Sequence, residues 1–340
     1  MPYQKEHLCK KMTRETVKHL PFHFDIPIDI RKQPENQKII NTILSDFNCN
    51  DVPVEMVSDG DVHYVYRVEA SPQKKFYIKI RREHFRSNPN ISIDPKEIQM
   101  EKKSIDILNE CLPGVGPNIL KFYPEFSTLC LEDVVGKNGT ATDLLVNSDP
   151  NEYWELGEFV GNLHRSLKDK KDQIRGNFEE IFYKNSLYYR LGFLNIPEVD
   201  NLVFDLYELP KQLIHGDLTT RNIVWDKENH SFRLYDLETM HNGNPIFDLA
   251  YLEAHIILEN SSNPRRLKEL LINFRNAYNQ NYPITDENTE IRLAHALVLL
   301  RLRGSSTFEP RNKFSHAELD NYCQRIISQP TSRPLTWDSL

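Results

Sequence analysis

The sequence is poor in the features that mark secreted, membrane and nucleic-acid-binding proteins. Only five of its 340 residues are cysteine, and no two of them form a CxxC pair. This scatter argues against a disulfide framework or a zinc site and predicts reduced thiols in a cytoplasmic protein. The longest apolar run, residues 293–302, contains His295 and Arg301 and is far shorter than a membrane span. The first twenty residues are charged throughout and lack the apolar segment of a signal peptide, so we expect no membrane partner.

Positive charge is not in excess either. The chain has 42 Lys and Arg against 49 Asp and Glu, a formal net charge of −7. Because phosphate backbones attract basic surfaces, this balance argues against nucleic acid as the main partner. No internal repeat or low-complexity segment is present, and 39% hydrophobic with 27% charged residues is a globular composition. The length exceeds what one core usually fills, so we expect two domains or lobes.

The first part of the chain predicts a small β-rich lobe. Residues 1–53 read as a polar extension that contains one short helix, 35–47. From residue 54, short runs rich in β-branched and aromatic residues alternate with turn-forming clusters, which is typical of antiparallel strands. We expect the lobe to span 54–134, with one helix at 95–111 and strands at 54–57, 64–68, 75–80, 119–123 and 127–131.

Residues 135–340 predict a larger, mainly helical lobe. Leu156, Phe159, Val160 and Leu163 follow the i, i+3, i+4, i+7 spacing of a buried helical stripe. The same pattern recurs at 249–258, 267–278 and 291–302, and two strand-like runs, 222–225 and 232–235, interrupt the helices. We therefore expect an α+β architecture of two lobes with a cleft near residues 132–139.

One segment of the second lobe carries chemistry. It contains His215-x-Asp217-x4-Asn222, and Asp236 follows at the end of a second strand. A hairpin between the two strands would bring Asn222 and Asp236 together. Carboxylate and amide oxygens suit Mg2+, which usually keeps phosphate and water as its other ligands. A carboxylate that accepts a hydroxyl proton and two oxygens that hold a metal are what phosphoryl transfer from ATP requires.

These loops resemble the catalytic and metal-binding loops of the aminoglycoside phosphotransferase and choline kinase-like superfamily, which has a protein-kinase-like fold. The family pattern is His-Gly-Asp-x4-Asn followed by Asp-x-Glu, and both are present. A proline followed by Asp-Leu-Ala, at 245–250, resembles the next family element. The resemblance implies that Asp217 is the catalytic base and that Asn222 and Asp236 bind Mg2+. It also implies supporting roles for His215, Glu238 and Asp248.

The small lobe can be read against the same resemblance. It implies that Lys79, in the third strand, contacts the ATP phosphates and pairs with an acidic residue of the next helix. Glu97 and Glu101 are one turn apart, and we prefer Glu101. The turn at 58–62 would cover the phosphates, although it has one glycine, Gly60, where protein kinases have three. The strand and hinge that hold adenine would include Glu132 and Val134.

The leading hypothesis is an ATP- and Mg2+-dependent phosphotransferase that acts on a hydroxyl of a small molecule: an amino sugar, an amino alcohol or a sugar. A protein kinase is opposed by Asp236-Leu-Glu in place of Asp-Phe-Gly, and by only eleven residues between Asp236 and Asp248. A nucleotidylating enzyme on the same fold stays open. An inactive module is disfavoured because Lys79, Asp217, Asn222 and Asp236 are all present.

The sequence does not choose among acceptors. Candidate walls of the acceptor site are in the 165–210 insertion and at 301–305. Aromatic residues there would suit a quaternary amine, and arginines an anionic acceptor. Helix packing is the more common role for such aromatics, and a solvated helix end for such arginines. The residues concerned are Phe178, Tyr183, Tyr188, Tyr189, Arg190, Arg301 and Arg303.

Overall fold

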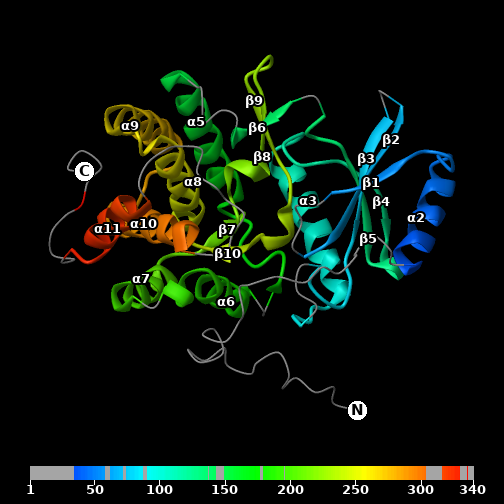
Figure 1. Cartoon of the computed structure of the whole chain (residues 1–340), viewed down its shortest axis with the longest axis horizontal. Helices are drawn as coiled ribbons and strands as arrows, with labels where there is room; N and C mark the ends of the chain where they lie inside the picture. Colours follow the sequence, from blue (N-terminus) through cyan, green and yellow to red (C-terminus); the bar gives the residue numbers. More distant parts are fainter. Residues whose placement is uncertain are drawn as a thin grey trace, which may run out of the picture.

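The computed structural model describes residues 34–57, 62–71, 74–86, 90–136, 138–142, 149–176, 179–194, 196–303, 316–329 and 335. These residues form a small lobe built on an antiparallel sheet and a larger lobe that is mostly helical (Figure 1). The α+β, two-lobed, protein-kinase-like fold predicted from the sequence is confirmed.

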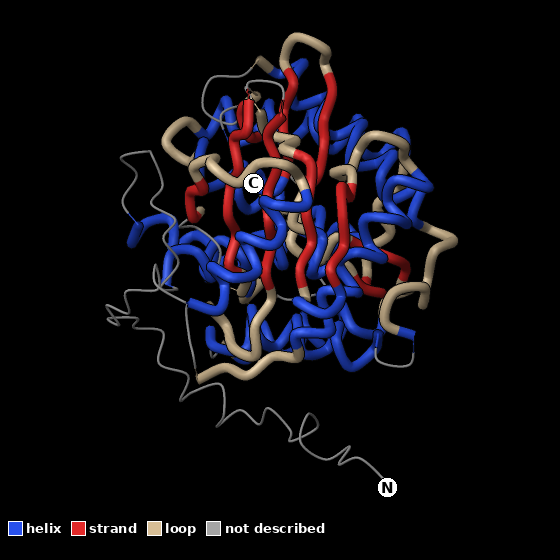
Figure 2. Tube along the Cα trace, turned by 90° about the vertical axis from the view of Figure 1, so that its right-hand side faces the viewer, coloured by secondary structure: helices blue, strands red, loops and turns tan. Residues whose placement is uncertain are grey.

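The small lobe is a five-stranded antiparallel sheet with one helix on each face. The strand order is β1-β2-β3-β5-β4. Figure 2 shows the strands side by side, with α2 across the face nearest the viewer. The elements are α2 (Pro34–Asp46), β1 (Val54–Met56), β2 (Tyr64–Ser71), β3 (Lys74–Ile80), α3 (Ile98–Cys111), β4 (Ile119–Tyr123) and β5 (Thr128–Glu132), with short 3-10 turns at Pro95–Glu97 and Pro124–Phe126.

Alternation along β3 separates the core of the small lobe from its functional face. Phe76, Ile78 and Ile80 are buried in one hydrophobic cluster with Ile43 of α2. Lys79 points to the opposite face, because successive side chains of a strand alternate. On that face α3 packs, and its core continues into the helical lobe. Helix α2, which the sequence assigned to an extension, thus packs on the sheet, while the domain boundaries at 53 and 134 stay predictions.

The helical lobe surrounds two short sheets that carry the loops of interest. β7 (Gln212–Ile214) pairs with β10 (His241–Gly243), and β8 (Ile223–Asp226) pairs with both β6 (Gly139–Thr140) and β9 (Ser231–Leu234). None of the described helices is long and apolar enough to cross a membrane. They are α5 (Pro150–Leu167), α6 (Glu179–Leu191), α7 (Pro197–Glu208), α8 (Pro245–Asn260), α9 (Pro264–Asn281), α10 (Glu287–Arg303) and α11 (His316–Ile327), with 3-10 turns at Gly192–Leu194, Thr220–Asn222 and Leu237–Thr239.

Helix α8 begins where the chain leaves the β-structure. Asn244 precedes it in an extended conformation and accepts a hydrogen bond from the Ile246 N–H at 2.9 Å, and Pro245 occupies the first turn. Asparagine as N-cap and proline at the first helical position are both favourable, because these N–H groups have no partner within the helix. This start places Asp248 in the first turn, under the loop that contains His215 and Gly216.

Candidate active site

Asp217 and Asn222 lie in one loop between β7 and β8. The Asn222 amide nitrogen donates to the Asp217 carbonyl at 2.9 Å and to Asp217 Oδ2 at 3.1 Å. Since that nitrogen does the donating, the Asn222 side-chain oxygen is the atom available to a metal ion. The β8–β9 hairpin then returns the chain, and the Tyr235 N–H donates to the Asn222 carbonyl at 3.1 Å. The loop and the residue before Asp236 are therefore directly connected, as the hairpin argument predicted.

The ring of His215 joins the same two segments. Its Nδ1 lies 3.3 Å from the Asp217 N–H, and its Nε2 lies 3.3 Å from the Tyr235 carbonyl oxygen. Both contacts are satisfied by the tautomer with its proton on Nε2. His215 is almost completely buried, so it acts as a fixed spacer between the Asp217 loop and the Asp236 strand.

Asp248 holds the loop from below. Its two carboxylate oxygens accept the backbone N–H groups of His215 (2.7 Å) and Gly216 (2.8 Å). His164 of α5 lies 3.3 Å from Asp248 Oδ2 and 2.8 Å from the Tyr278 hydroxyl. Burial opposes ionisation of Asp248, but these hydrogen bonds and the nearby histidines lower its pKa below the usual range. The carboxylate therefore stays charged and fixes the loop that precedes Asp217.

Lys79 connects the lobes at this site. Its ammonium lies 2.7 Å from Glu101 Oε1 and 2.6 Å from Asp236 Oδ1. Burial acts to lower the pKa of Lys79, but the charges of Asp236 and Glu101 outweigh it and raise the pKa. Asp236 itself has a left-handed backbone, with φ of 58°, which is uncommon for a residue with a side chain. The structure thus brings Lys79, Glu101 and Asp236 together, and Glu101 rather than Glu97 is the partner of Lys79.

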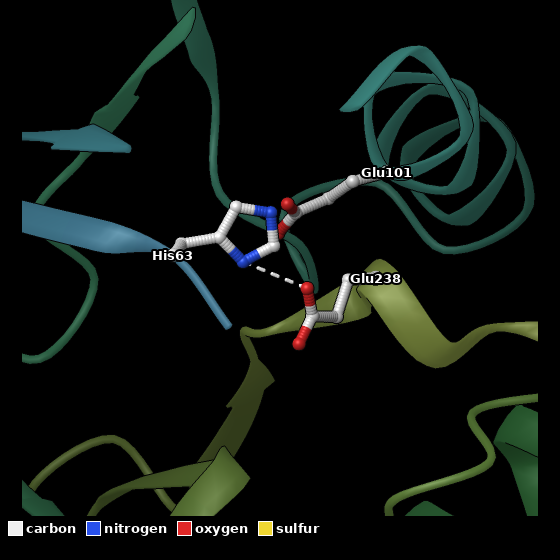
Figure 3. A group of neighbouring side chains, drawn as sticks. All are labelled: His63, Glu101 and Glu238. Carbon is white, nitrogen blue, oxygen red and sulfur yellow. Dashed lines mark ion pairs between the residues drawn. The ribbon is translucent and has the colours of Figure 1, made fainter. Parts of the chain in front are cut away.

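Next to this trio lies a second ionic cluster that the sequence did not reveal. His63 Nδ1 is 2.7 Å from Glu238 Oε2, as the dashed line in Figure 3 marks. Arg81 lies 3.4 Å from His63 Nε2, and donates to Glu97 at 2.7 Å. Burial alone would raise the pKa of Glu238, but His63, Lys79 and Arg81 lower it. Glu238 is thereby fixed as a carboxylate two residues after Asp236.

The side chains of His63, Glu101 and Glu238 converge closely enough to suggest a metal site (Figure 3). Two cations already occupy its surroundings, because Lys79 contacts Glu101 and Arg81 lies 3.6 Å from Glu238 Oε2. A further cation would meet their repulsion in a buried setting. Asn222 and Asp236 are the better donors for Mg2+: both offer oxygen, and the Asp236 side chain is 38% exposed.

Arg190 of α6 lies on the other side of Asp217. One guanidinium nitrogen is 3.2 Å from Asp217 Oδ1, and another donates to the Ser186 hydroxyl at 2.7 Å. The sequence indicates Arg190 only as a candidate wall of the acceptor site, because nothing in it links position 190 to position 217. Tyr183, another candidate, is completely buried and donates to the Leu206 carbonyl, so it belongs to the core of the lobe. Phe178 and the side chains of Tyr188 and Tyr189 lie outside the described part.

The region expected to hold the nucleotide base is partly described. The Glu132 N–H donates to the Asn118 carbonyl at 3.0 Å, and its side chain pairs with Arg233 at 2.9 Å. The Glu132 N–H and side chain are therefore both engaged within the protein. Val134 follows two residues later and is buried. Gly60, predicted to cover the phosphates, lies outside the described residues.

The chain matches the Phosphotransferase enzyme family over residues 57–287 and belongs to it. This match confirms the superfamily resemblance drawn from the motifs. No curated protein matches the sequence.

Solved structures share the fold at low sequence identity. Amicoumacin kinase hAmiN, in complex with AMP-PNP and Ca2+, is 15% identical with a TM-score of 0.53, over 91% of this chain and 99% of that one. Choline kinase LicA from Streptococcus pneumoniae is 18% identical with a TM-score of 0.53, over 87% and 99%. An ethanolamine kinase from Plasmodium vivax is 15% identical with a TM-score of 0.53, over 95% and 97%.

Proposed function

We propose that this phosphotransferase moves the γ-phosphoryl group of ATP to a hydroxyl of a small molecule, with Mg2+, in the cytoplasm. The observation that carries the proposal is the contact of Lys79 with both Glu101 and Asp236. It joins a cation of the small lobe to the predicted metal ligand of the large lobe. That ligand is connected through Tyr235 to the loop of Asp217 and Asn222.

In this proposal Asp217 accepts the proton of the acceptor hydroxyl. The hydroxyl oxygen forms a bond to the γ-phosphorus, the bond to the β,γ-bridging oxygen breaks, and ADP leaves with that electron pair. Lys79 binds the ATP phosphates, and Glu101 positions Lys79. Mg2+, held by Asn222 and Asp236, would neutralise phosphate charge. Most of the rate would come from positioning and electrostatics.

The remaining predicted residues support this machinery from outside. Asp248 and His215 position the loop of Asp217 through the hydrogen bonds described above. Glu238, paired with His63, keeps the Asp236 turn against the small lobe. We propose that the backbone groups of Glu132 and Val134 hold adenine and that Gly60 lies over the phosphates.

Relatives of the same fold support a small acceptor. The similar structures include kinases of amicoumacin, choline and ethanolamine, and the first of these was solved with AMP-PNP. The interval after Asp236 also favours this reading. β10 starts at His241 and α8 at Pro245, which leaves no long segment there to bind a peptide.

The test compares Asp217→Asn with Asp226→Asn. Asp226 is at the exposed turn of the β8–β9 hairpin, where it accepts hydrogen bonds from Asn229, and is a matched control. ADP release is measured over a panel of hydroxylated metabolites, and AMP-PNP binding by calorimetry with Mg2+. Loss of a general base is worth about 10²–10⁴ in rate, so we expect Asp217→Asn to lose turnover by that factor while AMP-PNP affinity is kept.

Three outcomes would contradict the proposal in different ways. No binding of AMP-PNP with Mg2+ would remove the kinase function altogether. Equal turnover by the wild type and Asp217→Asn would show that Asp217 is not the base. Release of pyrophosphate in place of ADP would indicate nucleotidyl transfer.

A further inference from the structure

The side of Asp217 that faces the helical lobe is rich in arginine. Arg190 of α6, Arg221 of the catalytic loop and Arg301 of α10 come from three segments far apart in the sequence. Two of them flank one ring: the guanidinium carbons of Arg190 and Arg301 lie 5.8 Å and 5.4 Å from the centre of the Tyr251 ring. Arg190 and Arg301 therefore lie on either side of one ring beside the predicted base, and the charge of Arg221 reaches the same part of α8.

The guanidinium of Arg190 is fixed by its contacts and remains positively charged. Its side chain is 14% exposed and it contacts Asp217, Ser186 and the ring faces of Phe247 and Tyr251. Burial acts to lower its pKa, but Asp217 and Tyr251 raise it, so the guanidinium stays charged. A buried guanidinium needs an anionic partner, because an unpaired charge in such a site is costly. Here that partner is the carboxylate that the proposed reaction uses as its base.

Arg301 has unused hydrogen-bonding capacity. It donates to the Tyr251 hydroxyl at 3.0 Å. Its Nε is buried and has no hydrogen-bond partner among the described residues. Arg303, two residues on, is by contrast paired with both oxygens of Asp320. Among the described residues, Arg301 thus differs from Arg303 in having no carboxylate partner.

Within the described part of the chain, the nearby acidic groups of α8 and α10 have other partners and do not neutralise this positive charge. His255, one turn after Tyr251 on α8, has a pKa well below the usual range because of burial and of the charges of Arg301 and Arg221. Glu253 of the same helix lies 3.2 Å from Arg275, and Glu290 also pairs with Arg275. Asp248 is fully engaged with the loop backbone and His164. Among these acidic groups, Asp217 is the one that faces the arginines.

We propose that the acceptor carries an anionic group, a carboxylate or a phosphate, close to its reactive hydroxyl, and that Arg190 and Arg301 bind this group. The inference rests on the proposed phosphotransfer and names its substrate class. Guanidinium groups bind carboxylate and phosphate through two parallel hydrogen bonds, with more geometric specificity than a lysine gives. A cationic amine would meet the like charges of Arg190 and Arg301 beside Asp217, which disfavours the amino sugars and amino alcohols considered above.

Binding of the acceptor anion to Arg190 would also free Asp217 to act as the base. While Arg190 contacts Asp217 Oδ1 at 3.2 Å, the guanidinium occupies the oxygen that would take the hydroxyl proton. An acceptor anion competes for Arg190 and draws the guanidinium away from Asp217, which leaves Oδ1 for the hydroxyl proton. An anionic acceptor is thereby coupled to activation of its own hydroxyl, and a neutral acceptor is not.

Calorimetry on the full chain, saturated with AMP-PNP and Mg2+ so that nucleotide phosphates occupy the Lys79 region, tests the proposal. The probes share a three-carbon frame: D-glycerate carries a carboxylate, glycerol 3-phosphate a phosphate, and glycerol no charge. Choline serves as the cationic probe. We expect at least one anion to bind at least tenfold more tightly than glycerol, with no binding of choline. The stronger anion identifies the anionic group.

Matched variants locate the binding. Arg301→Gln and Arg190→Gln should each weaken anion binding at least tenfold, whereas Arg265→Gln, on the exposed surface of α9, should leave it unchanged. Arg301→Lys keeps the charge and should retain part of the affinity, and thermal unfolding of each variant checks the fold.

The proposal is overturned if neither anion binds better than glycerol, if choline binds better than both, or if Arg301→Gln and Arg301→Lys bind the anion as well as the wild type. Failure of AMP-PNP itself to bind would instead overturn the proposed function. Phosphorylation of a cationic amine would support the function and overturn the inference.

Discussion

At the scale of single residues, the loop before Asp217 leaves no space for a side chain at Gly216. Its φ is +79°, and a Cβ there would lie 2.5 Å from the Thr239 carbonyl oxygen and 2.6 Å from the His241 ring. Gly114 has almost the same φ, +82°, and open space around the Cβ position. The two glycines therefore separate the cost of a left-handed backbone from the cost of a steric clash.

We predict that Gly216→Ala destabilises the protein far more than Gly114→Ala. The backbone term alone costs about 1 kcal/mol, so Gly114→Ala should lower the free energy of unfolding by about that amount. Gly216→Ala should add at least about 2 kcal/mol, since backbone and a buried ring must shift. Urea unfolding followed by circular dichroism measures both. Equal losses would mean that the loop can relax around a methyl group.

At the scale of elements, α2 supplies the small lobe with the cover of one sheet face. Ile43 is completely buried against the cluster that contains Phe76 and Ile78, while Thr42, its neighbour, is exposed. We predict that Ile43→Ala lowers the free energy of unfolding by about 2–5 kcal/mol, the usual cost of such a truncation in a core. Thr42→Ala should change it by no more than about 0.5 kcal/mol.

Urea unfolding measured by fluorescence gives both values for α2. A cost below 1 kcal/mol for Ile43→Ala would show that α2 does not stabilise the sheet. The AMP-PNP affinity of the same two variants is the control, because the predicted nucleotide site lies on the other face of the sheet. We expect this affinity to be unchanged at temperatures where the variants are folded.

Elements with a clear period could be predicted, and those without one could not. The strands that include Lys79 and Cys130 and the helix of Ile105 stood out because their apolar residues alternate or repeat at helical spacing. β7 and β10 have three residues each, too few to show a period, and pair across a gap in sequence that no local pattern reveals. In α6, apolar and aromatic residues occur around the helix without a clear stripe, which hid it.

The same distinction applies to the site. Asp217, Asn222 and Asp236 lie within one short stretch, and their spacing made a motif readable from the chain. The placement of His63 beside Glu238 and of Arg190 beside Asp217 depends on how separate elements pack. Sequence position carries no information on such contacts, so these two contacts came only from the structure.

At the scale of the whole molecule, buried histidines predict how stability responds to acid. Burial lowers the pKa of His241 to about 3 and that of His295 to about 4, so both are neutral in the folded protein. In the unfolded chain they would take up protons below about pH 6.5. Between pH 6.5 and 4 the unfolded state therefore binds more protons, and stability falls as the pH falls.

We predict that each of these histidines contributes a slope of up to about 1.4 kcal/mol per pH unit in that window. His295→Gln should make the unfolding free energy less dependent on pH between 4.5 and 6, while His230→Gln, at a side chain 67% exposed, should leave the slope as in the wild type. Urea unfolding at a series of pH values measures it. Identical slopes in all three proteins would show that His295 is not neutral when folded.

The alternation along β3 limits how this lobe can change in evolution. Substitutions can alter the α2 side or the Lys79 side of the strand independently, because neighbouring residues face opposite ways. An insertion or deletion of one residue between Phe76 and Ile80 would exchange the two faces, turning Lys79 towards α2 and an isoleucine towards Glu101. Length variation among descendants of this chain should therefore collect in the loops around β3, and the strand itself should vary in sequence but never in length.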